Sequence, residues 1–335
     1  MYPIEDEDVF KIALGSSILF FSCLSFEERC VKLPRLISEN FDGDIIWSLF
    51  FLIDNLSSQK EECRNIQYKI GSNLLEELNI QLNIPEYDLH NPSVINYLVD
   101  TFSEVLKKES EIDSIIVDIS TTPKKIFIPF IKWLLDEELN LLQNKNLFIT
   151  YTKPEQYGRS EMESEPLIPE ILINNLKNKE HILWAVFLGF KATFLQLIWE
   201  FINNMKMKMK IIPYIGFPSF RPDFLDRSLV LHAKALETNE ELYQALKRNT
   251  EYCPTDDPYA VFHIIRDLVE KNEDKEIILT ALGAKPITLG VTLAAIEYDL
   301  PIIHIQPKTY HKDYSKGFKK SHFYWIYKRN ELTYI

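Results

Sequence analysis

A series of segments that recurs in the same order in both halves of the chain is the feature that most constrains its fold. Each half contains two long apolar runs rich in β-branched and aromatic residues, which are typical of buried strands. The matching runs are 17–27 with 182–191, and 44–54 with 210–217. The residue numbers of Ser25 and Gly189, near the ends of the first pair, differ by 164. The spacing therefore predicts two copies of one structural unit.

Amphipathic helices and further strands continue the repeat. Asn91-Pro92 and Asp257-Pro258 each open a stretch with the i, i+1, i+4, i+5, i+8 apolar pattern of a helix that buries one face. An Asn or Asp cap before proline suits a first helical turn, because proline has no N–H to satisfy. Each half then continues with a strand, a helix and a last strand that closes on Pro-x-x-Tyr. These segments are 115–119, 126–139, 147–151 and 154–157 in the first half, and 277–281, 287–296, 302–305 and 307–310 in the second.

Continuous apolar strands separated by helical stretches indicate parallel sheets that helices cover on both faces. Four matches in one order favour duplication over chance. The sequence therefore predicts an α/β fold of two tandem Rossmann-like units with mainly parallel sheets and internal duplication. We expect the first unit over residues 1–157, a connector with a short helix at 168–177 over 158–180, and the second unit over 181–335.

Composition argues against several classes of function. The 335-residue chain has a formal net charge of −12, whereas general nucleic-acid binders show a basic domain or stripe. Its 9 glycines form neither a GxGxxG nor a GxxxxGK[ST] phosphate loop. The 4 cysteines form no CxxC pair and the 7 histidines no HExxH, so we expect reduced thiols and no metal site.

The amino-terminal sequence carries no export or membrane signal. It is acidic at residues 5–8, where a secretory signal is basic, and the apolar run at 12–21 is too short to span a bilayer. We therefore expect a cytoplasmic protein that is not embedded in a membrane.

Residues 311–329 form a basic and aromatic segment in this acidic chain. Such a composition can stack bases and neutralise phosphates, so this segment is the one place where the sequence allows nucleic-acid contact. The alternative is an edge strand at 323–328 whose aromatic face packs inward while lysines protect the edge.

Ligands of open parallel sheets gather at the carboxyl ends of the strands, where turns and helix N-termini converge. The candidate ligand-binding residues are Ser25, Ser120, Thr121 and Lys124 in the first half, and Gly189, Lys191, Gly283, Lys285 and Thr288 in the second. Glu27 and Asp118 are the candidate catalytic carboxylates. For both acids the alternative is electrostatic support of a helix start.

The segment 280–290 has the most specific chemistry of these turns. Gly283 lets the backbone turn close to a ligand, Lys285 offers a charged donor at a helix start, and Thr288 falls on the first turn. This combination suits a phosphate or an adenine-type nucleotide. The alternative is that Gly283 only makes the turn and Lys285 is solvated. The matching segment 120–125 has hydroxyls and lysines but no glycine, and simple N-capping is its alternative.

A strand followed by Gly283-x-Lys285-Pro and a small-residue helix resembles the CARF domains, which sense cyclic oligoadenylates in CRISPR-linked antiviral defence. Two such units in one chain resemble the SAVED sensors. The resemblance implies a nucleotide held between two units, near Gly283, Lys285, Thr288 and the turns at Ser25 and Gly189. The sequence departs from the family at Ala284, where a hydroxyl residue is commoner, and it contains no recognisable effector domain.

Three functions remain open. The first is a nucleotide-binding sensor that signals to a protein partner or a second copy of itself. The second is a hydrolase or glycosyl-transfer enzyme of nucleotide metabolism that uses Glu27 or Asp118 as its acid/base group. The third is a scaffold subunit of a larger complex whose strand ends have lost ligand binding. No cofactor is indicated by the sequence.

Overall fold

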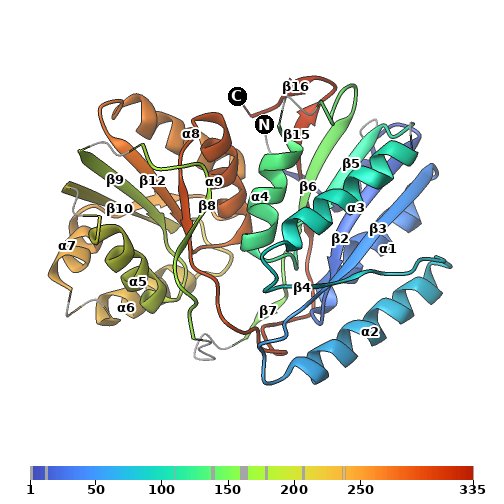
Figure 1. Cartoon of the computed structure of the whole chain (residues 1–335), viewed down its shortest axis with the longest axis horizontal. Helices are drawn as coiled ribbons and strands as arrows, with labels where there is room; N and C mark the ends of the chain where they lie inside the picture. The colour runs from blue at the N-terminus through green and yellow to red at the C-terminus, as the bar shows by residue number, and fades with distance from the viewer. Residues whose placement is uncertain are drawn as a thin grey trace. The chain divides into compact units, whose positions relative to one another are not determined.

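The computed structural model describes residues 3–11, 14–109, 111–136, 140–158, 165–177, 180–205, 208–235, 237 and 239–334. The chain divides into two compact units. The first unit comprises Met1–Glu165 together with Lys308–Ile335, and the second unit comprises Pro166–Pro307. Figure 1 shows that each unit consists of a sheet flanked by helices.

The main sheet of the first unit has five parallel strands among the residues described, with antiparallel strands added at one side. Across the sheet the order is β4 (Glu86–Asp88), β3 (Asp44–Ile53), β2 (Ser17–Leu24), β5 (Ser114–Asp118), β6 (Asn146–Thr152), antiparallel β15 (Ser321–Lys328) and β1 (Ile4–Glu5), with β16 (Glu331–Leu332) paired to β15. A separate ribbon pairs β7 (Gln156–Tyr157) with β14 (Ser315–Lys316). Every residue of β2 is buried, because helices cover both faces of the central strands.

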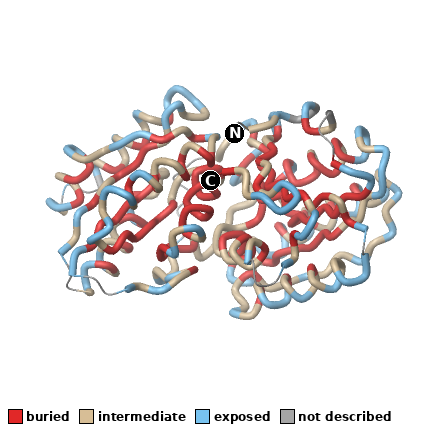
Figure 2. The backbone as a smooth tube through the Cα atoms, turned by 90° about the horizontal axis from the view of Figure 1, so that it is seen from above, coloured by how far each residue is buried: buried red, intermediate tan, exposed pale blue. Residues whose placement is uncertain are grey.

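Helices complete the first unit. They are η1 (Asp6–Lys11), η2 (Glu28–Val31), α1 (Lys32–Asn40), α2 (Lys60–Glu77), α3 (Val94–Lys108) and α4 (Lys124–Leu134). Aliphatic and aromatic side chains of β2, β3 and α1 form a buried core that includes Phe20, Leu24 and Ile37. Figure 2 shows buried backbone following the strands inside the unit.

The second unit has the same strand order in its described part. The order is β11 (Glu251–Cys253), β10 (Lys208–Gly216), β9 (His181–Phe187), β12 (Glu276–Ala281), β13 (Ile302–His304) and antiparallel β8 (Glu170–Ile173). Its helices are α5 (Ala192–Asn203), α6 (Phe224–Ala235), α7 (Glu240–Arg248), α8 (Pro258–Glu270) and α9 (Lys285–Glu297). In each unit the five parallel strands, numbered in chain order, therefore stand as third, second, first, fourth and fifth across the sheet, and an antiparallel strand adjoins the fifth.

These findings confirm a mixed α/β fold with mostly parallel sheets. They also correct two expectations about the chain's organisation. The helix predicted at 168–177 is wrong: β8 (Glu170–Ile173) lies in this segment, and its backbone pairs antiparallel with β13. Residues 308–335 were expected in the second unit, but β15 pairs with β6 along its length and belongs to the first.

The two predicted helix caps have different outcomes. Asp257 caps α8 as predicted, because its carboxylate accepts the N–H groups of Tyr259 and Ala260. The equivalent prediction at Asn91 is wrong, since α3 begins at Val94 and Asn91 instead accepts the N–H of Ser93 in the preceding turn. The predicted helix 126–139 includes residues 137–139, which lie outside the described residues. No described helix has the length and apolar character needed to cross a membrane.

Candidate functional site

In a sheet of this strand order, the crevice for ligands opens between the first and fourth strands at their carboxyl ends. That position falls between β2 and β5 in the first unit and between β9 and β12 in the second. The predicted site residues follow these strands in both units. Their surroundings, however, differ sharply.

In the first unit, Asp118 is buried in a polar network at the end of β5. Its carboxylate accepts the N–H of Ser120 at 2.9 Å and also the Ser120 hydroxyl. The hydroxyls of Thr150 and Ser22 lie 3.4 and 3.5 Å away. Ser120 Oγ in turn accepts the N–H of Thr152 at 2.7 Å. Asp118 and Ser120 therefore hold the ends of three neighbouring strands together.

Glu27 belongs to a second buried cluster, with Arg29 as its ion-pair partner. Arg29 Nη2 lies 2.8 Å from Glu27 Oε2, and Arg29 Nη1 donates to the Thr152 carbonyl at 3.3 Å. The Ser315 hydroxyl also donates to Glu27. Burial alone would lower the pKa of Arg29, but the Glu27 carboxylate and nearby tyrosines, including Tyr151, raise it above its ordinary value. Arg29 is thus held charged.

The remaining first-unit candidates also bond within the protein. Thr121 Oγ1 donates to the Cys23 carbonyl at 2.6 Å, and Ser25 Oγ accepts the N–H of Glu27 at 3.4 Å. Lys124 is the first residue of α4. Near them, burial raises the pKa of the Cys30 thiol to about 12, so this cysteine stays protonated at neutral pH.

A segment of the chain's own carboxyl-terminal part covers the acidic groups after β2 and β3. We call residues 308–320 the C-terminal strap. Its N–H groups at Tyr310 and Gly317 donate to Asp54 at 3.0 Å and Glu28 at 3.1 Å. Lys312 Nζ pairs with Glu62 at 2.6 Å. Several basic groups of the strap are therefore bonded to acidic groups within the first unit.

In the second unit, glycines lie at the carboxyl ends of the equivalent strands. Gly189 and Gly283 each lie two residues after the last paired residues of β9 and β12, which are Phe187 and Ala281. Gly216 is the last residue of β10, two residues after Tyr214, the partner of Phe187. A Cβ on Gly189 would lie 2.3 Å from the Leu282 carbonyl, and one on Gly283 would lie 2.9 Å from the Leu188 carbonyl. Glycine is needed here so that the two turns can touch.

The start of α9 follows Gly283 directly. Ala284 precedes the helix in an extended conformation and has no side chain that can cap it. Lys285 is the first helical residue, and Pro286 has no N–H. The Thr288 hydroxyl is fully buried and donates to the Ala284 carbonyl at 3.1 Å. Thus Lys285, rather than Thr288, stands at the helix start with its side chain partly exposed.

The two helices that follow the fourth strands begin alike. Pro123 before α4 has φ −59° and ψ 149°, and Ala284 before α9 has φ −62° and ψ 157°. Neither residue caps its helix with a side chain, and both helices begin with lysine. The residues that precede these two helices therefore share one backbone conformation.

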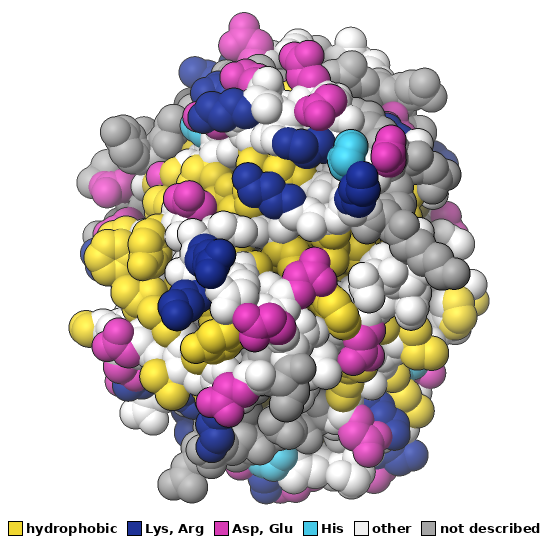
Figure 3. All heavy atoms as spheres, turned by 90° about the vertical axis from the view of Figure 1, so that its left-hand side faces the viewer, with side chains coloured by type: hydrophobic (Ala, Val, Ile, Leu, Met, Phe, Trp, Pro, Cys, Tyr) yellow, Lys and Arg dark blue, Asp and Glu magenta, His cyan; other side chains and the backbone are white. Residues whose placement is uncertain are grey.

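Sequence reasoning missed three second-unit residues at the ends of β10 and β11. The aromatic side chains of Phe217 and Tyr252 are 54% and 53% exposed. Thr255 is 6% exposed, and its hydroxyl has no hydrogen-bond partner among the described residues. The signal was weak, because a Phe-Pro turn and a lone Tyr on a short edge strand carry no motif. Figure 3 shows apolar patches interspersed with basic and acidic side chains on the face at the left of Figure 1.

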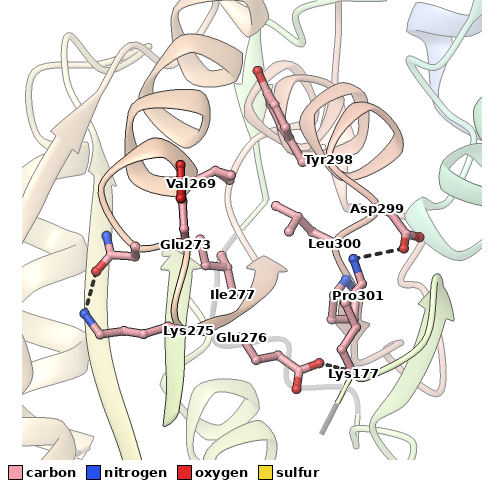
Figure 4. A pocket seen from close by; sticks show the side chains of 11 residues that line it. Lys177, Val269, Glu273, Lys275, Glu276, Ile277, Tyr298, Asp299, Leu300 and Pro301 are labelled. Atoms are coloured by element: carbon pink, nitrogen blue, oxygen red, sulfur yellow. Dashed lines mark hydrogen bonds and ion pairs between the residues drawn. The ribbon is translucent and has the colours of Figure 1, made fainter. Parts of the chain in front are cut away.

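A pocket of about 250 Å³ opens at the other end of the second unit's sheet, before β12 and β13 (Figure 4). Lys177 and Asp299 form an ion pair at 3.0 Å on its wall, and Lys275 donates to Asn272 at 2.6 Å. Glu276 accepts the backbone N–H of Lys177. None of the predicted site residues lines this pocket.

Within the C-terminal segment 311–329, residues 321–328 form β15. Phe323 and Tyr324 are fully buried, and Trp325 stacks on Phe148 at 5.1 Å, which confirms that the aromatic side chains pack inward. The expected edge position is wrong, because β1 and β16 pair with parts of the other side of β15. Within the described ranges, no three His, Cys, Asp or Glu side chains come together as a metal-binding group. All four cysteines are buried and free. No protein-family model matches this sequence, and no curated protein matches it either.

Proposed function

We propose that this chain binds a nucleotide and holds its phosphate at the carboxyl ends of β9 and β12 in the second unit. One observation carries the proposal. Three glycines lie at the carboxyl ends of neighbouring strands, beside a helix that begins with Lys285 and has no side-chain cap. Bare glycine backbone admits an anion closely. The N-terminus of α9 adds its positive dipole end and the lysine adds a full charge.

The first unit supports the same assignment by contrast. Its predicted residues Asp118, Glu27 and Ser120 bond to other groups of the protein, and the C-terminal strap covers the neighbouring acids. An anion would meet two buried carboxylates there, which repel it. We therefore assign the phosphate to the second unit alone.

We also propose that the two units are Rossmann-like and arose by internal duplication. The shared strand order, the antiparallel strand beside each fifth strand and the equal starts of α4 and α9 support this origin. The same features support the resemblance to the CARF and SAVED sensors of prokaryotic antiviral defence. As a sensor, the protein would pass ligand binding on to a protein partner or a second copy of itself.

An enzyme of nucleotide metabolism ranks second. Its candidate acids, Glu27 and Asp118, are engaged as acceptors by Arg29, Ser120 and Ser315, which suits structural support better than proton transfer. A scaffold without a ligand ranks third, because it gives no role to the uncapped start of α9 with its lysine.

Calorimetric titration with mono-, di- and cyclic nucleotides tests the proposal. Lys285→Ala should weaken binding by about 10- to 150-fold, the loss of one charge-assisted hydrogen bond of about 1.5–3 kcal/mol. Lys271→Ala, which removes an exposed lysine of the same unit, should leave affinity unchanged. Absence of heat with every nucleotide, or equal affinities of wild type and Lys285→Ala, would favour the scaffold.

A further inference from the structure

Two exposed aromatic rings stand at the ends of adjacent strands in the second unit. Phe217 directly follows β10, and Tyr252 lies in β11. Both side chains are more than half exposed. Among the aromatic side chains that the structure describes, Phe217 and Tyr252 are the two most exposed, so their position side by side needs an explanation.

The two rings are fixed relative to each other. The backbone pairs Gly216 with Cys253, and the N–H of Phe217 donates to the Cys253 carbonyl at 2.7 Å. The ring centroids of Phe217 and Tyr252 lie 6.0 Å apart at 65°. This edge-to-face pair, which we call the aromatic ledge, leaves ring surface open for a planar ligand.

The ledge lies close to the proposed phosphate site. A Cβ on Gly216 would lie 2.5 Å from Thr255 Oγ1 and 3.5 Å from Ile287 Cδ1. Ile287 is in the first turn of α9, two residues after Lys285. One glycine therefore separates the ledge from the turn that begins with Lys285, so a single small molecule can reach both.

Thr255 supplies an independent sign of a ligand at this point. Its side chain is more than nine-tenths buried, yet its hydroxyl has no hydrogen-bond partner among the residues described. A buried hydroxyl without a partner carries a desolvation cost that a ligand group can relieve. The hydroxyl lies against Gly216, at the boundary of the ledge and α9.

The charges near the ledge suit an uncharged ring better than a second anion. Glu251 precedes Tyr252 and is exposed, and Asp257 caps α8 just beyond Thr255. Arg221, in the turn after Phe217, is already paired with Asp223 at 2.9 Å. These acidic neighbours disfavour an anion at the ledge, whereas a neutral aromatic base tolerates them.

We propose that Phe217 and Tyr252 stack the aromatic base of the ligand, so that the second unit recognises nucleoside phosphates rather than sugar phosphates or inorganic phosphate. This inference rests on the proposed function and adds a base subsite to its phosphate subsite. Stacking on aromatic side chains tolerates different bases, because every base has a π-face. Thr255 then contributes a hydrogen bond to the bound molecule.

Titration of AMP, ribose 5-phosphate and pyrophosphate against the full chain tests the base subsite. Wild type should bind AMP more tightly than ribose 5-phosphate. Phe217→Ala and Tyr252→Ala should each weaken AMP binding by about 5- to 150-fold, the range for one stacked base, and leave pyrophosphate affinity unchanged. Tyr252→Phe, which keeps the ring, and Tyr97→Ala, which removes an exposed tyrosine of the first unit, should bind AMP like wild type.

Thr255→Val keeps the shape of the side chain and removes only the hydroxyl, so it should weaken AMP binding without unfolding the protein. Equal AMP affinity in wild type and the double variant Phe217→Ala/Tyr252→Ala overturns the base subsite, as does equal affinity for AMP and ribose 5-phosphate. If pyrophosphate still binds in those cases, the phosphate subsite stands. If none of the three compounds binds wild type, both proposals fail.

Discussion

The carboxyl ends of the parallel strands are built differently in the two units, although the strand order is the same. In the first unit, buried charged side chains such as Glu27, Arg29 and Asp118 fill this region. In the second unit, glycines lie at or just after the ends of the equivalent strands. The same strand order thus carries a buried polar cluster in one unit and glycines in the other.

The difference has a physical basis in burial. A charged group that is taken from water needs a partner and several hydrogen bonds, which Ser120, Ser315 and Thr152 supply in the first unit. The strap completes this arrangement. Glycine offers no side chain to satisfy, so the strand ends of the second unit need no such polar cluster.

The largest expected effect concerns the buried charged cluster at the carboxyl ends of the first unit's strands. Arg29→Met should lower the free energy of unfolding of that unit by about 3–5 kcal/mol, because it leaves Glu27 buried without its counter-ion. Arg35→Met is the matched control, since its ion pair with Glu77 is more than a third exposed and is worth at most about 1 kcal/mol. Urea unfolding followed by circular dichroism measures both. Similar losses in the two variants would show that the cluster is not a structural element.

The next effect concerns the glycines of the second unit. Gly189→Ala should cost about 1–3 kcal/mol, because its Cβ would meet the rigid backbone carbonyl of Leu282. Gly216→Ala should cost less, since its Cβ would meet only the Thr255 hydroxyl, which can rotate away. Thermal unfolding of both variants checks the ranking. A Gly216→Ala variant that is the less stable of the two would contradict the close contact of the turns.

The pH dependence of stability tests how α6 packs against the turn at Gly189. The Ser228 hydroxyl of α6 donates to the Gly189 carbonyl, and His232 lies one helical turn further on. Burial lowers the pKa of His232 below its ordinary value of 6.5, and the Ser228 carbonyl offsets part of this shift. As the pH falls below 6.5, the unfolded chain binds a proton that the folded chain resists, so stability decreases.

His232→Leu should therefore lose less stability than wild type between pH 7 and pH 5. Urea unfolding at several pH values measures the two slopes, and His263 remains in both proteins as a common background. Identical slopes would mean that His232 is not buried in its neutral form.

The smallest expected effect lies in the strap. Lys312→Ala removes an ion pair with Glu62 whose two side chains are 33% and 53% exposed. Such a pair contributes at most about 1 kcal/mol and less at high salt. Urea unfolding at low and high salt should show a small loss that salt abolishes. A large, salt-independent loss would mean that the strap is held mainly through this lysine.

Much of the frame of the molecule could be predicted from the sequence. The apolar runs located β2, β5, β9 and β12, and the Asp257-Pro258 cap located α8, because these signals are local and physical. The segment 168–177 misled, since a short apolar stretch can form a helix or an edge strand and only pairing with β13 decides. The return of β15 to the first sheet is a contact between distant residues, which periodicity does not encode.

The candidate site was predictable in part. The strand-end rule selected Asp118, Gly189 and Lys285 correctly as residues at the carboxyl ends. It could not predict which unit carries a buried polar cluster at its strand ends, because the partners of Glu27 include Ser315, 288 residues away along the chain. Phe217 and Tyr252 were missed since their exposure depends on tertiary packing.

Hydrogen exchange with and without bound nucleotide tests the contrast between the two units most directly. The amides at the start of α9, Lys285 and Ile287, should exchange more slowly in the presence of the nucleotide that titration selects, together with those near Gly189. The amides at the start of α4, Lys124–Ile126, should be unchanged. Slower exchange at the start of α4 with no change at the start of α9 would contradict the assignment of the ligand to the second unit.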